Sequence, residues 1–175
     1  MKTIIFLPIR DYFGSRKRLF LKFLVPLLIG VIVFVGALVF DVNNALESFG
    51  EFISVQINIV AILLSFSVAI ITILVSADNI NIQKLRNTLS SEENYKPINK
   101  KQLSLFQIML SSISYNAVVE IIYLVLLIGI SLIKEIVPFV TLKYLTAICV
   151  FMIMHILHVL LESVAQMYLT FWDKK

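Results

Sequence analysis

Four long apolar stretches constrain the fold of this chain more than any other feature of its sequence. They cover residues 19–40, 52–76, 105–133 and 139–171. Each reaches the about 20 residues that a helix needs to cross the hydrocarbon core of a bilayer. Because backbone groups in lipid must be satisfied within the segment, each stretch is predicted to be a transmembrane helix. The sequence therefore predicts an all-α polytopic membrane protein, a bundle of four transmembrane helices.

The remaining segments are short and carry most of the charge. They are a basic N-terminal segment 1–18, loops 41–51, 77–104 and 134–138, and a tail 172–175. Hydrophobic residues make up 59% of the chain, against roughly 45–50% in soluble domains. The single cysteine, Cys149, excludes an intramolecular disulfide and any cysteine-based metal motif.

The positions of lysine and arginine predict the orientation in the membrane. Thirteen of the 15 Lys and Arg residues lie within 1–22, 84–101 or 174–175. Only Lys134 and Lys143 lie elsewhere. Since cytoplasmic loops of membrane proteins are rich in Lys and Arg, both termini and the 77–104 loop are predicted to be cytoplasmic, an N-in/C-in topology. The expected location is the bacterial inner (cytoplasmic) membrane.

The cytoplasmic segments carry candidate contacts to lipid headgroups or to a cytoplasmic protein partner. These residues are Arg16, Lys17, Arg18, Lys84, Arg86, Lys100 and Lys101. The N-terminal segment is expected to lie along the membrane surface, with a disordered tail as the alternative. In the 77–104 loop, Ile82, Leu85 and Leu89 recur at helical spacing, which indicates that the second span continues beyond the membrane. The loop is too short for a catalytic domain.

The second apolar stretch carries a continuous row of small or polar residues, which we call the small-residue face. Its members are Ser54, Asn58, Ala61, Ser65, Ala69, Thr72 and Ser76. Steps of three and four residues place them on one side of a helix. Small residues let helix backbones approach closely in lipid, and polar side chains add hydrogen bonds between helices. The face is predicted to pack within or between protomers, and pore lining is the alternative.

A second polar pattern lies in the third and fourth stretches. Glu120 falls near mid-membrane, where a charged carboxylate costs at least about 2.5 kcal/mol. In MHILHVLLES, the spacing of His155, His158 and Glu162 puts three polar side chains on one helix face. The short loop between the two stretches predicts antiparallel neighbouring helices. The predicted intramembrane polar cluster comprises Asn116, Glu120, Tyr123, His155, His158 and Glu162.

Folding the chain about residues 136–137 predicts the register of this helix pair. Ser111 or Ser112 then lies level with Glu162. Three interpretations of the cluster remain open: a metal site, a proton or ion path, and hydrogen-bonded packing that locks the helices together. The metal interpretation lacks an H-E-x-x-H signature. A proton path suits histidine, which titrates near neutral pH, but packing is the interpretation that we favour.

No enzymatic motif is present in the sequence. It has no glycine-rich phosphate loop, no G-x-S-x-G and no paired intramembrane aspartates. We therefore expect no catalytic residues, no metal, no cofactor and no direct nucleic acid binding. Gly30 and Gly36 are expected to serve close helix packing.

The whole-chain pattern of four spans, short loops, cytoplasmic termini and no enzymatic domain resembles a known class. The class is the small four-span accessory membrane proteins of bacterial antiphage defence systems, of the type of the Kiwa membrane subunit or the type VI-B CRISPR accessory protein. The resemblance is one of architecture, and no functional residues carry over from it. It implies a non-enzymatic, homo-oligomeric membrane sensor or effector, pore-forming or membrane-perturbing, that works with a cytoplasmic partner.

Other functions remain compatible with the sequence. A small proton or ion channel or transporter would use Glu120 with His155 and His158. A phage superinfection-exclusion protein or a holin-like protein shares the same gross features. A scaffold would recruit a partner through the N-terminal segment and the 77–104 loop.

Overall fold

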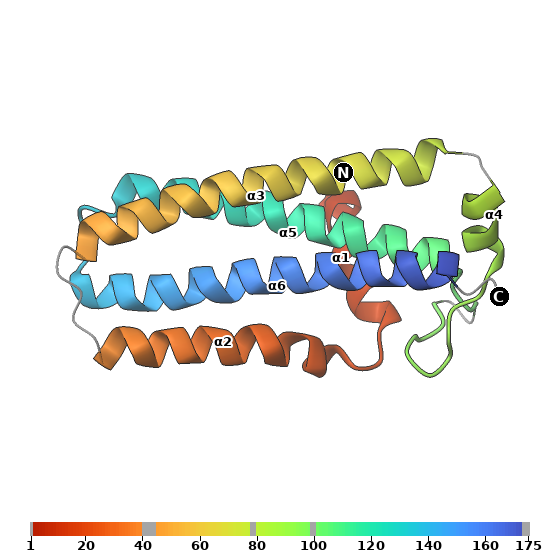
Figure 1. The fold of residues 1–175 in the computed structure, drawn as a ribbon, viewed down its shortest axis with the longest axis horizontal. Helices are drawn as coiled ribbons and strands as arrows, with labels where there is room; N and C mark the ends of the chain where they lie inside the picture. The colour runs from red at the N-terminus through yellow and green to blue at the C-terminus, as the bar shows by residue number, and fades with distance from the viewer. Residues whose placement is uncertain (1, 40–44, 78–79, 99–100, 173–175) are drawn as a thin grey trace. The chain divides into compact units, whose positions relative to one another are not determined.

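The computed structural model describes residues 2–39, 45–77, 80–98 and 101–172. Over these ranges the chain is all-helical, as predicted, with six helices and no β-strand beyond isolated bridges. The helices are α1 (Lys2–Ser15), α2 (Leu19–Val39), α3 (Ala45–Ser76), α4 (Ile80–Asn87), α5 (Leu105–Ile133) and α6 (Phe139–Trp172) (Figure 1).

Four of the described helices, α2, α3, α5 and α6, are long and apolar enough to cross a membrane. The protein is therefore a multi-pass membrane protein. In the most apolar part of α2 and α3, 11% and 17% of the residues are buried, against 33% in α5 and in α6. The exposed remainder is largely Leu, Ile, Val and Phe, a surface that suits lipid rather than water.

The second span begins earlier than its apolar stretch predicts. α3 starts at Ala45, inside the region expected to be the outer loop 41–51, whose residues 41–44 lie outside the described part of the chain. Glu47 in the first turn favours a helix start there. Phe49 is buried, and the absence of a side chain at Gly50 leaves room for the Lys134 amine, 2.6 Å from where a Cβ would lie. Packing thus extends the helix beyond the apolar run.

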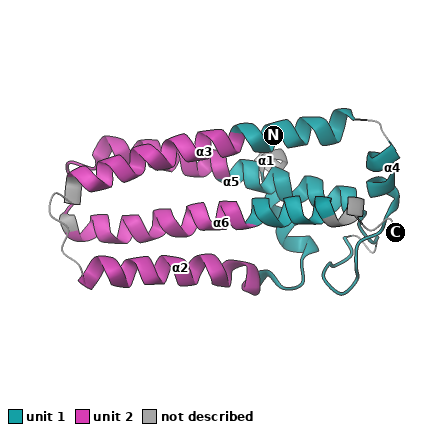
Figure 2. Ribbon diagram, in the orientation of Figure 1, with its two compact units in different colours: residues 1–19, 65–119, 159–175 teal, residues 20–64, 120–158 magenta. Residues whose placement is uncertain are grey.

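The structure divides into two compact units (Figure 2). Unit 1 comprises residues 1–19, 65–119 and 159–175, and unit 2 comprises residues 20–64 and 120–158. α3, α5 and α6 contribute residues to both units, whereas α4 belongs to unit 1.

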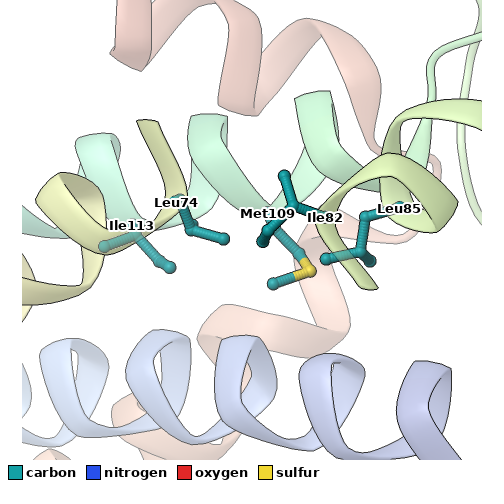
Figure 3. Close-up of a cluster of buried hydrophobic side chains, with 5 residues drawn as sticks. All are labelled: Leu74, Ile82, Leu85, Met109 and Ile113. Carbon is teal, nitrogen blue, oxygen red and sulfur yellow. The ribbon is translucent and has the colours of Figure 1, made fainter. Parts of the chain in front are cut away.

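The core of unit 1 joins α3, α4 and α5. It is formed by Leu74, Ile82, Leu85, Met109 and Ile113 (Figure 3). The prediction that the second span continues through residue 89 is wrong, because α3 ends at Ser76 and α4 is a separate helix. Ile82 and Leu85 are buried, as a helical face requires, but Leu89 lies after the helix end and is exposed.

Unit 2 is held by close contacts of its helices. Gly30 of α2 packs on α6, since a Cβ there would lie 3.2 Å from Phe151 Cβ. Gly36, which the sequence also assigned to close packing, has no described atom within 4 Å of the same position, so that expectation is wrong. The Tyr123 hydroxyl of α5 donates to the carbonyl oxygen of Cys149 in α6 at 2.9 Å. This contact confirms that α5 and α6 are neighbours with a register centred near residue 136.

Candidate functional site

A buried arginine links the N-terminal segment to two membrane spans in unit 1. Arg16 follows the last residue of α1 and is only 1% exposed. Its guanidinium donates to Glu162 Oε1 of α6 at 2.6 Å and to the Ser112 hydroxyl of α5. A charge-assisted hydrogen bond of this kind is roughly twice as strong as a neutral one. Arg16 therefore joins three elements of unit 1.

Aromatic rings enclose the guanidinium. Arg16 Cζ lies 4.3 Å from the centroid of the Tyr12 ring and 5.7 Å from that of Tyr95. Tyr12 in turn stacks on Tyr115 of α5, with ring centroids 3.9 Å apart and an interplanar angle of 9°. Cation–π contacts strengthen when water is excluded, so the rings both shield the ion pair and fix α1 against α5.

Backbone hydrogen bonds connect residues 15–17 to the loop between α4 and α5. Lys17 N donates to Asn94 O at 3.1 Å, and Lys96 N donates to Ser15 O at 2.7 Å. The Lys17 amine also donates to the backbone carbonyl of Glu92. Residues 15–17 and 94–96 thus form a short antiparallel pairing, which orients the Arg16 side chain toward α5 and α6.

Gln166 completes the arrangement from α6. Its amide nitrogen donates to Glu162 Oε1 at 3.0 Å and to the Tyr95 hydroxyl at 2.5 Å. Burial raises the pKa of Tyr12 and of Tyr95 above the ordinary tyrosine value, so both phenols stay neutral at physiological pH. We call this group the Arg16 cluster: Tyr12, Arg16, Tyr95, Ser112, Glu162 and Gln166.

Most polar groups of the Arg16 cluster bond one another, an arrangement that connects elements of the fold. The carboxylate and the guanidinium are engaged with each other, and Tyr95 is bonded to Gln166. The cluster connects the N-terminal segment, the loop between α4 and α5, and α6. Among the described residues, no group of three or more His, Cys, Asp or Glu side chains is placed to hold a metal ion.

The predicted intramembrane polar cluster is distributed over both units. Asn116 and Glu162 belong to unit 1, and Glu162 joins the Arg16 cluster. The members in unit 2 are Glu120, Tyr123, His155 and His158. Asn116, Glu120, Tyr123 and His155 are all buried, whereas His158 is half-buried.

In unit 2, Tyr123 and His155 connect their own helices to other helices. The Tyr123 hydroxyl lies 3.4 Å from Gln56 Oε1 of α3, besides its bond to the α6 backbone. His155 stacks on Phe23 of α2, with ring centroids 4.5 Å apart. These contacts join all four spans of the unit through Tyr123 and His155.

The small-residue face of α3 is exposed along its whole length. The exposed residues are Ser54, Asn58, Ala61, Ser65, Ala69, Thr72 and Ser76. The Thr72 hydroxyl donates to Val68 O at 2.9 Å and the Ser76 hydroxyl to Thr72 O at 2.5 Å. These two hydroxyls are therefore satisfied by the helix itself. Packing of this face within the protomer, one of the two predicted forms, is not what the structure shows.

The predicted headgroup or partner contacts have different outcomes. Arg16 is buried and paired, so its assignment to headgroups is wrong; Glu162 is the carboxylate that draws it inward. The exposed members are Lys17, Arg18, Lys84, Arg86 and Lys101. Arg86 also lies over the Phe106 ring, 4.9 Å from its centroid. Lys100 lies outside the described residues.

Sequence reasoning missed several residues that build these sites. Tyr12 and Tyr95 enclose Arg16, and Gln56 contacts Tyr123. A carboxylate near the end of a span needs a cation, so Glu162 was a signal for an arginine partner. The sequence offered many cations on the same side, and nothing in their spacing distinguished Arg16 from Arg18.

Comparisons with protein-family models, with curated proteins and with solved structures found no match to this chain.

Proposed function

We propose that this protein is a non-enzymatic, homo-oligomeric membrane component of bacterial antiphage defence, whose copies pack through the small-residue face of α3. The observation that carries the self-association is the exposure of that face over seven positions from Ser54 to Ser76. A face of small residues brings two helix backbones close together in lipid. Such a face gains little from contact with lipid chains alone.

Asn58 gives the strongest reason for a protein neighbour on this face. It lies within the α3 span and its side chain is exposed. An amide surrounded by hydrocarbon loses its hydrogen bonds to water, and measured bonds between spans recover about 0.6 kcal/mol on average. The amide carries both donor and acceptor groups, so Asn58 of a second copy is a complementary partner.

The biological setting rests on architecture. Four spans, short loops and the lack of an enzymatic motif resemble the accessory membrane proteins of antiphage systems. The distribution of Lys and Arg favours the bacterial inner membrane with cytoplasmic termini. Exposed Lys84, Arg86 and Lys101 on the cytoplasmic segments supply a surface for an acidic region of a cytoplasmic partner. In this proposal the protein senses or perturbs the membrane and couples to that partner.

Cysteine cross-linking in liposomes tests the self-association directly. The chain has one cysteine, Cys149, and it is buried, so an introduced thiol is the reactive one. Ala61→Cys should form disulfide-linked dimers on mild oxidation, whereas the neighbouring exposed position in Ile62→Cys should not. Asn58→Leu added to Ala61→Cys should reduce the dimer yield. Equal cross-linking at both positions would contradict the proposed face.

An ion channel is the second candidate, because an oligomer could also enclose the hydroxyls and amide of the small-residue face. Two observations weigh against it: Thr72 and Ser76 already bond their own helix, and Glu120 is fully buried rather than exposed. Proton flux across liposomes distinguishes the candidates. Flux in the wild type that disappears in Glu120→Gln, with oligomers intact, would favour the channel. Packing predicts no such flux.

A further inference from the structure

Unit 1 contains a cavity that belongs neither to the Arg16 cluster nor to the small-residue face. It lies between α1, the segment that contributes Ile98 and Leu103, and the first turns of α5, and has a volume of about 510 Å³. Ligand pockets in proteins commonly measure roughly 300–1,000 Å³. The inference drawn from it goes beyond the proposed function and does not depend on it.

The cavity walls combine apolar and polar side chains. Leu7, Leu103 and Leu110 supply apolar surface from all three elements. α5 adds the hydroxyls of Ser111 and Ser114 at positions three residues apart, and thus on one helix face. A ligand for such a cavity has an apolar part and several hydrogen-bonding groups.

Ser111 is the polar wall residue that points most clearly to a ligand. Its hydroxyl oxygen is buried and has no hydrogen-bond partner among the described residues. The adjacent Ser112 differs, since its hydroxyl donates to Ile108 O at 2.8 Å. A buried hydroxyl without a partner costs about 1–3 kcal/mol. Because Ser111 lines the cavity, rotation of its side chain would bring the hydroxyl to a ligand oxygen and remove that cost.

Two opposite charges stand side by side in the wall formed by α1. Arg10 Nη2 lies 3.3 Å from Asp11 Oδ1, and both side chains are exposed. An exposed pair of neighbouring residues contributes little stability by itself. The pair instead offers one site for an anion and an adjacent site for a cation. A zwitterion with a short separation between its charges matches this arrangement better than a singly charged group.

The location favours a lipid over a water-soluble zwitterion. α5 is one of the spans, and the cavity borders residues 107–114 of its first turns. Headgroups occupy the interfacial depth at which a span begins. Asp11 requires N–H donors, which a primary ammonium has and a quaternary ammonium lacks. These requirements together describe a phosphoethanolamine headgroup.

We propose that this cavity binds the headgroup of a phospholipid that carries a phosphate and a primary ammonium group. Arg10 holds the phosphate, Asp11 accepts hydrogen bonds from the ammonium, and Ser111 and Ser114 bond the glycerol and ester oxygens. The apolar walls contact the beginning of the acyl chains.

Native mass spectrometry of the full chain in detergent tests this proposal with three lipids that have identical acyl chains. Phosphatidylethanolamine should be retained roughly tenfold better than phosphatidylcholine or phosphatidylglycerol, as one charge-assisted hydrogen bond predicts. Asp11→Asn should abolish the preference. Glu93→Gln makes the same charge change at an exposed carboxylate outside the cavity and should keep it.

A second variant tests the cavity itself. Ser114→Leu should reduce retention of phosphatidylethanolamine by filling part of the space, while Arg18→Gln, an exposed change elsewhere, should not. Equal retention of the three lipids, or a preference that survives Asp11→Asn, would overturn the proposal. Binding of free phosphoethanolamine without binding of the lipid would also overturn it.

Discussion

The two units hold their buried polar groups in different ways. In unit 1 the Arg16 cluster is ionic, with a guanidinium and the Glu162 carboxylate 2.6 Å apart. In unit 2 the Tyr123 hydroxyl bonds a backbone carbonyl, and His155 stacks on Phe23. The difference follows the surroundings of each group.

Unit 1 contains α1 and the loop between α4 and α5, which lie outside the spans and enclose its ion pair. α1 and the loop at 94–96 supply rings and backbone bonds around Arg16, while the Glu162 side chain keeps 22% exposure. Partial exposure and several hydrogen bonds lower the cost of burying charge. Unit 2 is built mainly from the spans, and the hydroxyl bond of Tyr123 to the α6 backbone involves no charged group, so it avoids that cost. We call the Arg16–Glu162 ion pair the ionic lock; it lies where segments outside the spans enclose it.

The largest expected effect comes from breaking the ionic lock. Arg16→Met should lower the free energy of unfolding by about 3 kcal/mol, because it leaves Glu162 largely buried without its cation. Thermal unfolding in detergent can be followed with a thiol-reactive dye, since buried Cys149 becomes accessible only on unfolding. Arg18→Met is the matched control at an exposed position. Equal stability of the two variants would show that the Arg16–Glu162 pair does not stabilise the fold.

A steric change should have the next largest effect, and it acts in unit 2. Gly30→Leu should destabilise the protein by about 2 kcal/mol, because its side chain would collide with Phe151 of α6. Gly36→Leu should be tolerated, since no described atom lies within 4 Å of a Cβ there. The same dye assay measures both. If both glycines tolerate leucine, close packing of α2 on α6 does not hold unit 2.

The neutral contact of unit 2 should contribute less than the ionic lock of unit 1. Tyr123→Phe removes one hydroxyl bond to the α6 backbone and should cost about 1 kcal/mol. Tyr144→Phe, at an exposed tyrosine, serves as control. A loss as large as that of Arg16→Met would remove the contrast between the units.

The smallest effect at neutral pH is expected for Tyr12→Phe. The Tyr12 hydroxyl is buried without a hydrogen-bond partner among the described residues, so its removal should leave stability unchanged or slightly higher. Because burial raises the pKa of Tyr12, the unfolded state loses this proton more easily than the folded state, so the free energy of unfolding declines as the pH rises above about 10, the ordinary pKa of tyrosine. The melting temperature should therefore fall less between pH 8 and pH 11 in Tyr12→Phe than in wild type. An equal fall would place the alkaline sensitivity elsewhere.

The spans and the pairing of α5 with α6 could be predicted because few physical solutions exist. A bilayer demands helices of about 20 residues, and a short loop leaves two helices antiparallel with a narrow range of registers. The Tyr123–Cys149 bond confirms that register in unit 2. The link through Arg16 confirms it in unit 1, because Ser112 and Glu162 bind the same guanidinium.

The Arg16 cluster could not be predicted because it depends on contacts between distant parts of the chain. A basic segment before a span is usually interpreted as a headgroup contact. That interpretation stays a prediction for exposed Lys17 and Arg18, and it is wrong for buried Arg16. Stacking of Tyr12 on Tyr115 places the end of α1 beside α5, and Arg16 is the cation that there meets Glu162. Helical periodicity carries no information about such stacking. The start of α3 at Ala45 was missed for a related reason, since packing of Phe49 extends a helix beyond its apolar run.

The order of synthesis determines when the ionic lock can form. Arg16 leaves the ribosome 146 residues before Glu162, and the guanidinium has no carboxylate to join until the last span has been translated and inserted. The contact between Arg16 and Glu162 therefore forms only after α6 has been made, whereas the stacking of Tyr12 on Tyr115 needs only α1 and α5. A chain that lacks α6 has no Glu162 carboxylate for Arg16 to bind.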